Sequence, residues 1–384
     1  MFNVTKKIVF IGGGHTHSIV LNLLGKCPLS KVRLILITPD IYTPYSGMLP
    51  GHIAGFYSYS QCHINLQYLS NFAGSELYLD SVVGLDLKNN YVLCANKEPV
   101  SFDVLSIDIG SVPQQLSVLV GSEYTIGVKP VSRFLKCWYN LQENIWNNSG
   151  KSFSIAVVGG GAGGVELVLS MIRGLQGESC LKLPNVEFHL FHSGISLMPN
   201  YYYLVGEFIQ DLLLSKGVNL HLKERVCEVI KIIDDRLNVK CESGLILSCD
   251  YVFLVTQPSA ASWVKDSGIA TNDDGFILVN NALQSVSHHH IFAAGDIATM
   301  INYNLPKSGV FAVRQSKTLY DNLRRIMDDQ PLKSYKPQSS YLSLIGTGDG
   351  KAIATKGNFT LPPHKLLWCW KDFIDRRFME QFPQ

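Results

Sequence analysis

The stretch IAVVGGGAGGVE, residues 155–166, decides the fold of this 384-residue chain. Four apolar residues with strand character lead into Gly159, Gly161 and Gly164, spaced as G-x-G-x-x-G, and an apolar pattern with helical spacing follows. In such a unit the first glycine permits a tight turn, the second lets a pyrophosphate approach the backbone, and the third lets the helix pack closely on the strand. Backbone N–H groups at the start of the helix then face the anion. The stretch therefore predicts a dinucleotide-binding unit.

A second copy of this pattern lies near the start of the chain. Residues 8–17, IVFIGGGHTH, repeat the strand and the turn, with Gly12 and Gly14 in place and His17 where the third glycine would stand. The two turns are about one domain length apart. Two dinucleotide folds in one chain predict two dinucleotides, and the economical pair is a flavin and the nicotinamide that reduces it.

Composition limits the classes of protein that this chain belongs to. A hydrophobic content of 46% suffices for two ordinary cores, so two or three domains are expected, and a net charge of +2 gives no electrostatic case for nucleic acid. The nine cysteines are odd in number and show neither CxxC nor zinc-finger spacing, which indicates reduced thiols in a cytoplasmic protein. The first residues resemble no signal peptide, and no stretch predicts a transmembrane helix.

Three consecutive histidines, His288 to His290, raise the question of a metal site. Adjacent side chains on a strand alternate between its faces, so at most two of the three imidazoles converge, and no cysteine or acid lies at ligand spacing. We therefore expect no metal.

The segment after the first turn gives weaker signals. A ribose-binding acid is expected at the tip of the strand 32–37, but Thr38 and Pro39 stand there and Asp40 comes two residues late. Thr38 is thus a weaker ribose ligand than a carboxylate. Residues 42–58 are too rich in glycine and proline for regular structure, and we expect a functional loop there; a plain surface connection is the alternative.

At this point the chain resembles a known family. The two glycine turns are combined, in order, with DVLSIDIGSVP (residues 103–113), CDYVFLVTQPS (249–259) and GFILVNNALQSVSHHHIFAAGDIA (275–298). This arrangement resembles the two-dinucleotide flavoproteins of the pyridine nucleotide-disulfide oxidoreductase superfamily over nearly the whole chain. Residues 45–58, 307–316 and 370–382 most resemble the branch found alone or fused to selenophosphate synthetase, which is similar to type II NADH dehydrogenases.

The resemblance implies an α/β fold with two Rossmann-like domains. It places a discontinuous FAD domain at residues 1–125 and 270–325, an inserted NAD(P)H domain at 126–269, and a small C-terminal α+β cap at 326–384. FAD is implied at Gly12, Gly14, Gly295 and Asp296, and NAD(P)H at Gly159, Gly161 and Gly164. Further candidate cofactor-binding positions are His15, His17 and Thr38 near the first turn, His192 at the tip of a strand in the second domain, and Pro44, Tyr45, Gly110 and Val310.

Several of these positions have structural alternatives. Asp296 is also placed to cap the helix that follows, and His17 to be a bulky helix residue. Glu166 matches a carboxylate that the family places near nicotinamide and flavin, but an acid in the first turn of a helix is favoured by the helix dipole alone. His192 stands where an acid favours NADH and an arginine admits NADPH, so coenzyme choice stays open.

Catalytic candidates besides Glu166 come from residues 306–315, PKSGVFAVRQ. The resemblance places this segment at the pyrimidine edge of the flavin. A helix start with Lys307 nearby stabilises negative charge on the reduced flavin, and Gln315 is the third candidate.

One departure from the family bears on the electron acceptor. Disulfide reductases of this superfamily carry a CxxxxC pair after the second strand, whereas residues 45–50 hold no cysteine. We therefore expect electrons to pass from NAD(P)H through FAD to a quinone-like acceptor in a ping-pong reaction. One alternative is sulfide:quinone chemistry, which needs converging thiols, with Cys62, Cys137 and Cys369 as candidates. The other is a redox-sensing accessory subunit that acts with selenophosphate synthetase.

The C-terminal tail predicts an amphipathic helix. Its apolar residues recur every four positions: Leu366, Trp370, Ile374, Phe378 and Phe382. Such a face must be covered. Docking on the chain's own body or on a homodimer partner is favoured over peripheral contact with the inner membrane face, because acidic residues in the tail oppose binding to anionic lipid.

Overall fold

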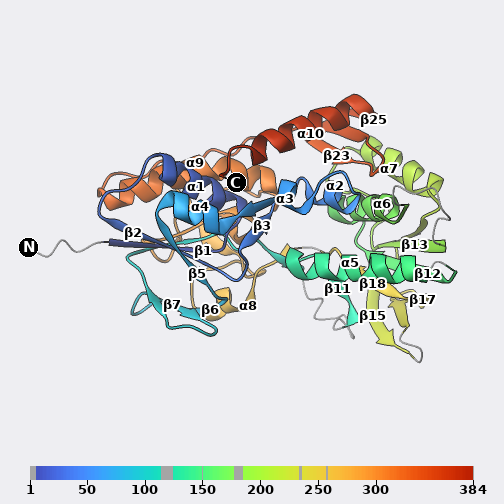
Figure 1. The fold of residues 1–384 in the computed structure, drawn as a ribbon, viewed down its shortest axis with the longest axis horizontal. Coiled ribbons are helices and arrows are strands. Elements are labelled where there is room, and N and C mark those ends of the chain that lie inside the picture. Colours follow the sequence, from blue (N-terminus) through green and yellow to red (C-terminus); the bar gives the residue numbers. More distant parts are fainter. Residues whose placement is uncertain are drawn as a thin grey trace, which may run out of the picture.

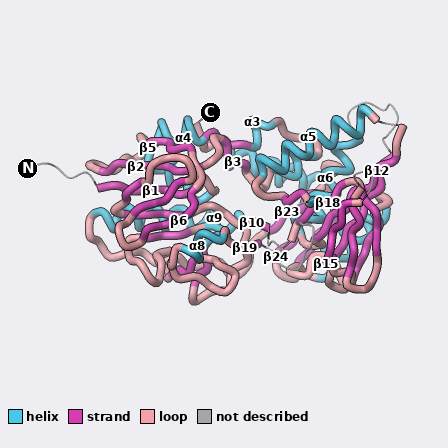
Figure 2. The backbone as a smooth tube through the Cα atoms, turned by 90° about the horizontal axis from the view of Figure 1, so that it is seen from below, coloured by secondary structure: helices cyan, strands magenta, loops and turns pink. Residues whose placement is uncertain are grey.

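The computed structural model describes residues 6–113, 124–148, 150–176, 185–232, 236–256 and 258–383. Two sheets lie in two lobes, and helices cover them (Figures 1 and 2). The expected mixed α/β fold with parallel, Rossmann-like sheets is confirmed. Of the expected features, the first five residues and Cys180 lie outside the described ranges.

The first sheet is parallel and has the order β21-β9-β1-β2-β5. Its strands are β1 (Lys6–Ile11), β2 (Val32–Thr38), β5 (Ser75–Leu79), β9 (Val104–Ile107) and β21 (Ile291–Ala293). Residues 8–11 of β1 are almost wholly buried, as expected for a parallel strand covered on both faces. Strand β21 returns to this sheet from far along the chain, so residues after the second sheet help to build the first lobe.

Three helices pack together over the first sheet: α1 (His15–Lys26), α4 (Leu66–Ala73) and α9 (Gly309–Met327). A separate three-stranded antiparallel sheet consists of β6 (Val82–Asp86), β7 (Tyr91–Cys94) and β8 (Val100–Ser101), and α8 (Ser262–Asp266) packs against β6. A short parallel pair joins β20 (Ile277–Val279) to β22 (Ala298–Met300), with the 3-10 helix η3 (Gly295–Ile297) just before β22.

The second sheet is also parallel, with the order β11-β18-β12-β13-β14. It contains β11 (Ile126–Gly127), β12 (Ser152–Val158), β13 (Asn185–His192), β14 (Asn219–Leu222) and β18 (Tyr251–Leu254). Its helices are α5 (Val131–Asn147), α6 (Ala162–Gln176) and α7 (Tyr203–Ser215). An antiparallel sheet shares an apolar core with the second sheet and consists of β15 (Val226–Lys231), β16 (Leu237–Cys241) and β17 (Ile246–Cys249). A short antiparallel pair joins β10 (Val112–Pro113) to β19 (Pro258–Ser259) where the chain passes between the lobes.

The prediction that residues 42–58 lack regular structure is wrong in part. Strand β3 (Tyr42–Pro44) pairs with β4 (His63–Asn65), and helices α2 (Leu49–Ile53) and α3 (Tyr59–Cys62) follow β3. Proline is well suited to the first turn of a helix because its missing N–H has no partner there, and Pro50 takes that place in α2. Ser58 and Gln61 form a capping box at the start of α3.

The C-terminal region forms an antiparallel sheet and a long helix. The strands are β23 (Ser343–Gly346), β24 (Ala352–Lys356) and β25 (Phe359–His364), and α10 (Lys365–Met379) extends from the second lobe toward the first (Figure 1). None of the described helices has the length and apolar character needed to cross a membrane.

Over most of α10 the apolar face predicted from the sequence does not dock on the chain's own body. Leu366 is 71% exposed, Trp370 47% and Ile374 41%, whereas Phe382 is buried. Another face docks on the body of the protein, and it carries Lys371 and Asp375, which are 7% and 4% exposed. Four-residue spacing predicts the helix, but it does not identify which face finds a partner.

The buried ion pair of α10 has a testable energetic role. Lys371 Nζ lies 2.5 Å from Asp375 Oδ2, so Asp375→Asn leaves a buried ammonium without its counter-charge. We expect a loss of about 3 kcal/mol in the free energy of unfolding, measured by urea titration. The matched control is Asp372→Asn, which breaks the partly exposed pair with Arg376 on the same helix and is expected to cost under about 1 kcal/mol. Equal losses in the two variants would contradict this account.

Candidate active site

The first glycine turn needs glycine because the backbone just after β9 lies against it. Gly12 has φ +87°, and a Cβ there would stand 2.4 Å from the carbonyl oxygen of Asp108. The N–H of Gly14 donates to that same oxygen at 3.1 Å. Helix α1 begins at His15, directly after the turn, so its first N–H groups lie at the carboxyl end of β1.

The three glycines of the second turn differ in what surrounds them. At Gly159, with φ +131°, a Cβ would lie 2.1 Å from the Val255 oxygen, and at Gly164 it would lie 1.8 Å from the Gly159 oxygen. At Gly161 a Cβ would have nothing within 4 Å. The outer two glycines therefore allow close packing, while the middle one faces open space where a phosphate group can approach. Gly110, in the first lobe, is equally open.

His15 and Tyr45 come together at the edge of the first turn. Their rings are 5.4 Å apart, and Phe378 at the end of α10 stacks on Tyr45 at 4.2 Å. The neighbouring N–H of Ser46 donates to His15 Nε2 at 3.3 Å, and burial lowers the pKa of His15, so the ring is neutral at pH 7. Pro44, another predicted position, ends β3 just before Tyr45.

His17 and Thr38, which the sequence predicted to bind cofactor, have side chains that are buried and hydrogen-bonded within the protein. The His17 ring is fully buried and bonds the Gly12 oxygen at 2.7 Å and Ser106 Oγ at 2.8 Å, and burial lowers its pKa to about 4. This placement matches the alternative of a structural helix residue. Thr38 is 5% exposed, and its hydroxyl donates to the Asp40 carbonyl at 3.3 Å.

Gly295 and Asp296 lie in η3, opposite the first turn. Gly295 has φ +69°, and its N–H donates to Gln315 Oε1 at 2.7 Å, which makes the buried Gln315 a positioning group. Asp296 Oδ2 accepts from Ser111 Oγ at 3.1 Å and from Lys129 Nζ at 3.2 Å. The alternative of Asp296 as a helix cap is wrong, because Ala294 holds the cap position and no side chain bonds there.

The start of α9 lies beside η3 and next to His15 of the first turn. Ser308 caps the helix by accepting from the N–H of Val310 at 3.4 Å, and a Cβ on Gly309 would stand 3.5 Å from His15 Nδ1. Lys307 Nζ donates to the Ala298 oxygen at 2.7 Å and to Thr299 Oγ1 at 2.8 Å, so it ties this loop to β22. Burial lowers the pKa of Lys307 to about 8.

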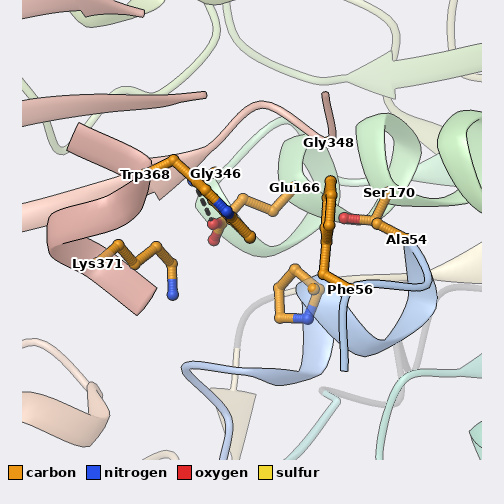
Figure 3. A pocket seen from close by; sticks show the side chains of 10 residues that line it. Ala54, Phe56, Glu166, Ser170, Gly346, Gly348, Trp368 and Lys371 are labelled. Atoms are coloured by element: carbon orange, nitrogen blue, oxygen red, sulfur yellow. Dashed lines mark hydrogen bonds between the residues drawn. The ribbon is translucent and has the colours of Figure 1, made fainter. Parts of the chain in front are cut away.

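Glu166 lies where the second lobe meets the C-terminal region (Figure 3). Its Oε1 accepts from the N–H of Gly346 at 2.8 Å, and it lines a pocket with Pro50, Phe56, Trp368 and Lys371. Burial raises the pKa of Glu166, while the nearby Lys371 ammonium opposes that rise. Helix α6 starts at Ala162 and has no acid in its first turn, so the helix-dipole alternative does not account for this residue.

His192 ends β13 beside the second turn. Its Nδ1 accepts from the N–H of Gly160 at 3.3 Å, and burial lowers its pKa, so the strand tip carries neither a carboxylate nor a cation at pH 7. Of the three thiols named for sulfide chemistry, Cys62 is buried with its pKa raised to about 12, which makes a poor nucleophile, while Cys369 is exposed.

Sequence reasoning missed three polar residues of the first site: Asp108, Ser111 and Lys129. Asp108 and Ser111 stand in residues 103–113, where only Gly110 was predicted as a site residue. Lys129 stands two residues before α5 and belongs to no motif. The structure also adds Lys371 and Phe378 from the C-terminal helix.

Comparisons with known proteins agree with this geometry. Residues 6–316 match the family described as pyridine nucleotide-disulphide oxidoreductase. Ferroptosis suppressor protein 1 of Homo sapiens is 27% identical over 70% of this chain and 69% of its own length. The NADH dehydrogenase-like protein YutJ of Bacillus subtilis is 23% identical over 95% of this chain and 99% of its own.

Solved structures share the fold. NDH2 from Plasmodium falciparum in complex with NADH superimposes with a TM-score of 0.81 at 15% identity, covering 98% of this chain and 97% of that one. The sulfide:quinone oxidoreductase of Aquifex aeolicus gives 0.75 at 17% identity, covering 98% and 92%. The expected cofactors, FAD and NAD(P)H, are those of the family. By its matched residues and its fold, this chain belongs to the pyridine nucleotide-disulphide oxidoreductase family.

Proposed function

We propose that this protein takes electrons from NAD(P)H onto FAD and passes them to a quinone-like acceptor. The observation that carries the proposal is the pair of glycine turns, one per parallel sheet, combined with the Glu166 pocket beside the C-terminal region and no cysteine in residues 45–50. Dinucleotides bind at the carboxyl ends of parallel strands, and a site without a redox disulfide needs an acceptor that takes electrons directly from the flavin.

The first lobe offers FAD a cradle that fits its parts. Gly12 and Gly14 present backbone to the pyrophosphate, and Asp296, held by Lys129 and Ser111, has a carboxylate able to accept from a ribityl hydroxyl. The start of α9 directs its N–H groups toward the same space. When bound, FAD accepts a hydride from the coenzyme and releases electrons to the acceptor.

The second lobe would hold NAD(P)H at the turn around Gly161. Glu166 lies one helical turn further along α6, which would bring a partly buried carboxyl near the end of the coenzyme that reacts. Its Oε1 is fixed by the Gly346 N–H, so Oε2 is the oxygen available to exchange a proton.

Proton transfer is the role that we assign to Glu166. Reducing a quinone to a hydroquinone with NADH consumes one proton from solution in addition to the transferred hydride. Burial keeps the Glu166 pKa above that of an ordinary carboxyl, which favours a group able both to hold and to release a proton. Phe56 and Trp368 contact each other, with ring centroids 4.8 Å apart, and give this side of the pocket an apolar wall.

Relatives support the quinone class. The type II NADH:quinone oxidoreductase of Haemophilus influenzae is 26% identical over 48% of this chain. The exposed apolar residues Leu366, Trp370 and Phe373 on α10 lie on the same helix as Trp368 of the pocket. That exposed face would serve the homodimer or peripheral membrane contact expected from the sequence. A vesicle sedimentation assay together with a measured oligomeric state separates the two.

The hypothesis of an accessory subunit predicts different kinetics. A redox sensor working with selenophosphate synthetase would be reduced quickly by coenzyme yet turn over slowly with every acceptor. The sulfide alternative requires that sulfide itself bleach the flavin, and the high pKa of Cys62 disfavours it.

The first test follows the flavin absorbance band under anaerobic conditions. NADH or NADPH is expected to bleach the band, and a quinone analogue added afterwards is expected to restore it. A dithiol substrate turned over faster than any quinone would contradict the absence of a thiol relay.

Replacing Glu166 tests its assigned role. We expect Glu166→Gln to slow reoxidation by quinone about 100-fold because the proton donor is lost, with flavin reduction by NADH changed little. Stopped-flow absorbance separates the two half-reactions. Glu207→Gln, an exposed acid on α7, is the matched control and should behave as wild type. An equal loss in both half-reactions of Glu166→Gln would mean that the residue positions the coenzyme and has no role in proton transfer.

His192 governs coenzyme choice in this proposal. A carboxylate at the strand tip binds the ribose of NADH and repels the 2′-phosphate of NADPH. We expect His192→Glu to raise the KM for NADPH at least about 10-fold relative to that for NADH. His192→Gln, which adds no charge, should leave the ratio near its wild-type value. If both variants shift the ratio equally, the effect comes from the altered turn at Gly160.

A further inference from the structure

Asp108 is a buried carboxylic acid at the centre of the first site. It follows β9 and is 2% exposed. Its backbone is fixed on both sides, because its N–H donates to the Ile11 oxygen at 2.9 Å and its oxygen accepts from Gly14 at 3.1 Å. The carboxyl is held by Thr16 and by the backbone N–H of His17, which donates to Oδ2 at 3.0 Å. It therefore faces the first turn of α1.

The carboxyl fills the space between the two glycines assigned to the flavin. A Cβ on Gly14 would lie 2.4 Å from its oxygens, and a Cβ on Gly295 would lie 2.4 Å from Oδ1. Both glycines thus leave room for this side chain, which lies between the glycine turn and η3.

The charged groups around Asp108 offer it no counter-ion among the described residues. Asp296 on η3 adds a second negative charge, and Lys129 bonds Asp296. From α1, burial lowers the pKa values of both His15 and His17, so these rings are neutral at pH 7. From α9, the neutral Gln315 bonds Gly295. Burial first, and Asp296 to a smaller degree, raises the pKa of Asp108 to about 7.

We propose that Asp108 holds FAD as a neutral acid whose O–H donates to the pyrophosphate, and that FAD binding above neutral pH takes up one proton from solvent. This inference rests on the FAD site of the proposed function and makes that site pH-dependent. A pyrophosphate beside an ionised Asp108 places like charges together in a buried site, whereas the neutral acid replaces that repulsion with a hydrogen bond.

The sign of the pH dependence follows from linkage. Without FAD the group titrates near pH 7, and an anionic ligand raises its pKa further. Well below pH 7 the acid is protonated in both states, so affinity is independent of pH. Above pH 7 the free protein loses this proton and the complex keeps it, so affinity falls by up to about tenfold per pH unit.

The test is FAD titration of the apoprotein from pH 6 to pH 9, followed by the quenching of flavin fluorescence. Wild type should bind FAD progressively more weakly above pH 7, whereas Asp108→Asn, which keeps the shape and donates without titrating, should bind with nearly constant affinity. Asp103→Asn is the matched control, because Asp103 is an exposed acid just before the same strand, and it should retain the wild-type slope. An unchanged slope in Asp108→Asn overturns the proposal.

Calorimetry of the wild-type protein gives an independent answer if Asp108→Asn fails to fold. FAD binding at pH 8, measured in two buffers of different ionisation enthalpy, should show uptake of close to one proton, and at pH 6 close to none. No uptake at pH 8 overturns the proposal. Neither experiment contains coenzyme or acceptor, so a failure here is distinct from a failure of the electron-transfer function.

Discussion

The close approach of backbone to backbone at the two glycine turns is the constraint on which this structure depends. Gly164 can lie against the Gly159 oxygen, and Gly159 against Val255, only because neither has a side chain. This contact sets the start of α6 at the carboxyl end of β12 and leaves Gly161 facing open space. At Gly12 the backbone of Asp108 makes the corresponding contact. The geometry of both proposed cofactor sites and the position of Glu166 follow from these contacts.

The C-terminal segment completes the site from outside both parallel sheets. Strand β23 supplies the Gly346 N–H to Glu166, and α10 supplies Lys371, which donates to the Gly47 oxygen, and Phe378, which stacks on Tyr45. Helix α10 thus contacts the loop after β3, the pocket lined by Glu166 and the ring of Tyr45. A buried ion pair on its docked face is costly unless both charges are satisfied, so this docking is specific in position.

The sequence predicted what local patterns determine. The glycine spacing predicted both turns, and apolar runs predicted β1, β2 and β12, because these elements are specified within a dozen residues. The contact between Glu166 and Gly346 joins residues 180 positions apart, and no local pattern reports it. Helix α2 was missed because glycine and proline content outweighed the favourable place of Pro50 in a first turn. Asp108 was missed because residues 103–113 drew attention only through the family resemblance and Gly110.

The central claim is that two dinucleotide cradles in one chain hold a flavin against its reductant. The absorption spectrum of the purified protein, taken before and after incubation with FAD and removal of free cofactor, tests it most directly. The account predicts a yellow protein with one FAD per chain and no comparable retention of FMN, because the glycine turn needs a pyrophosphate. A colourless protein that takes up no flavin on reconstitution would contradict it.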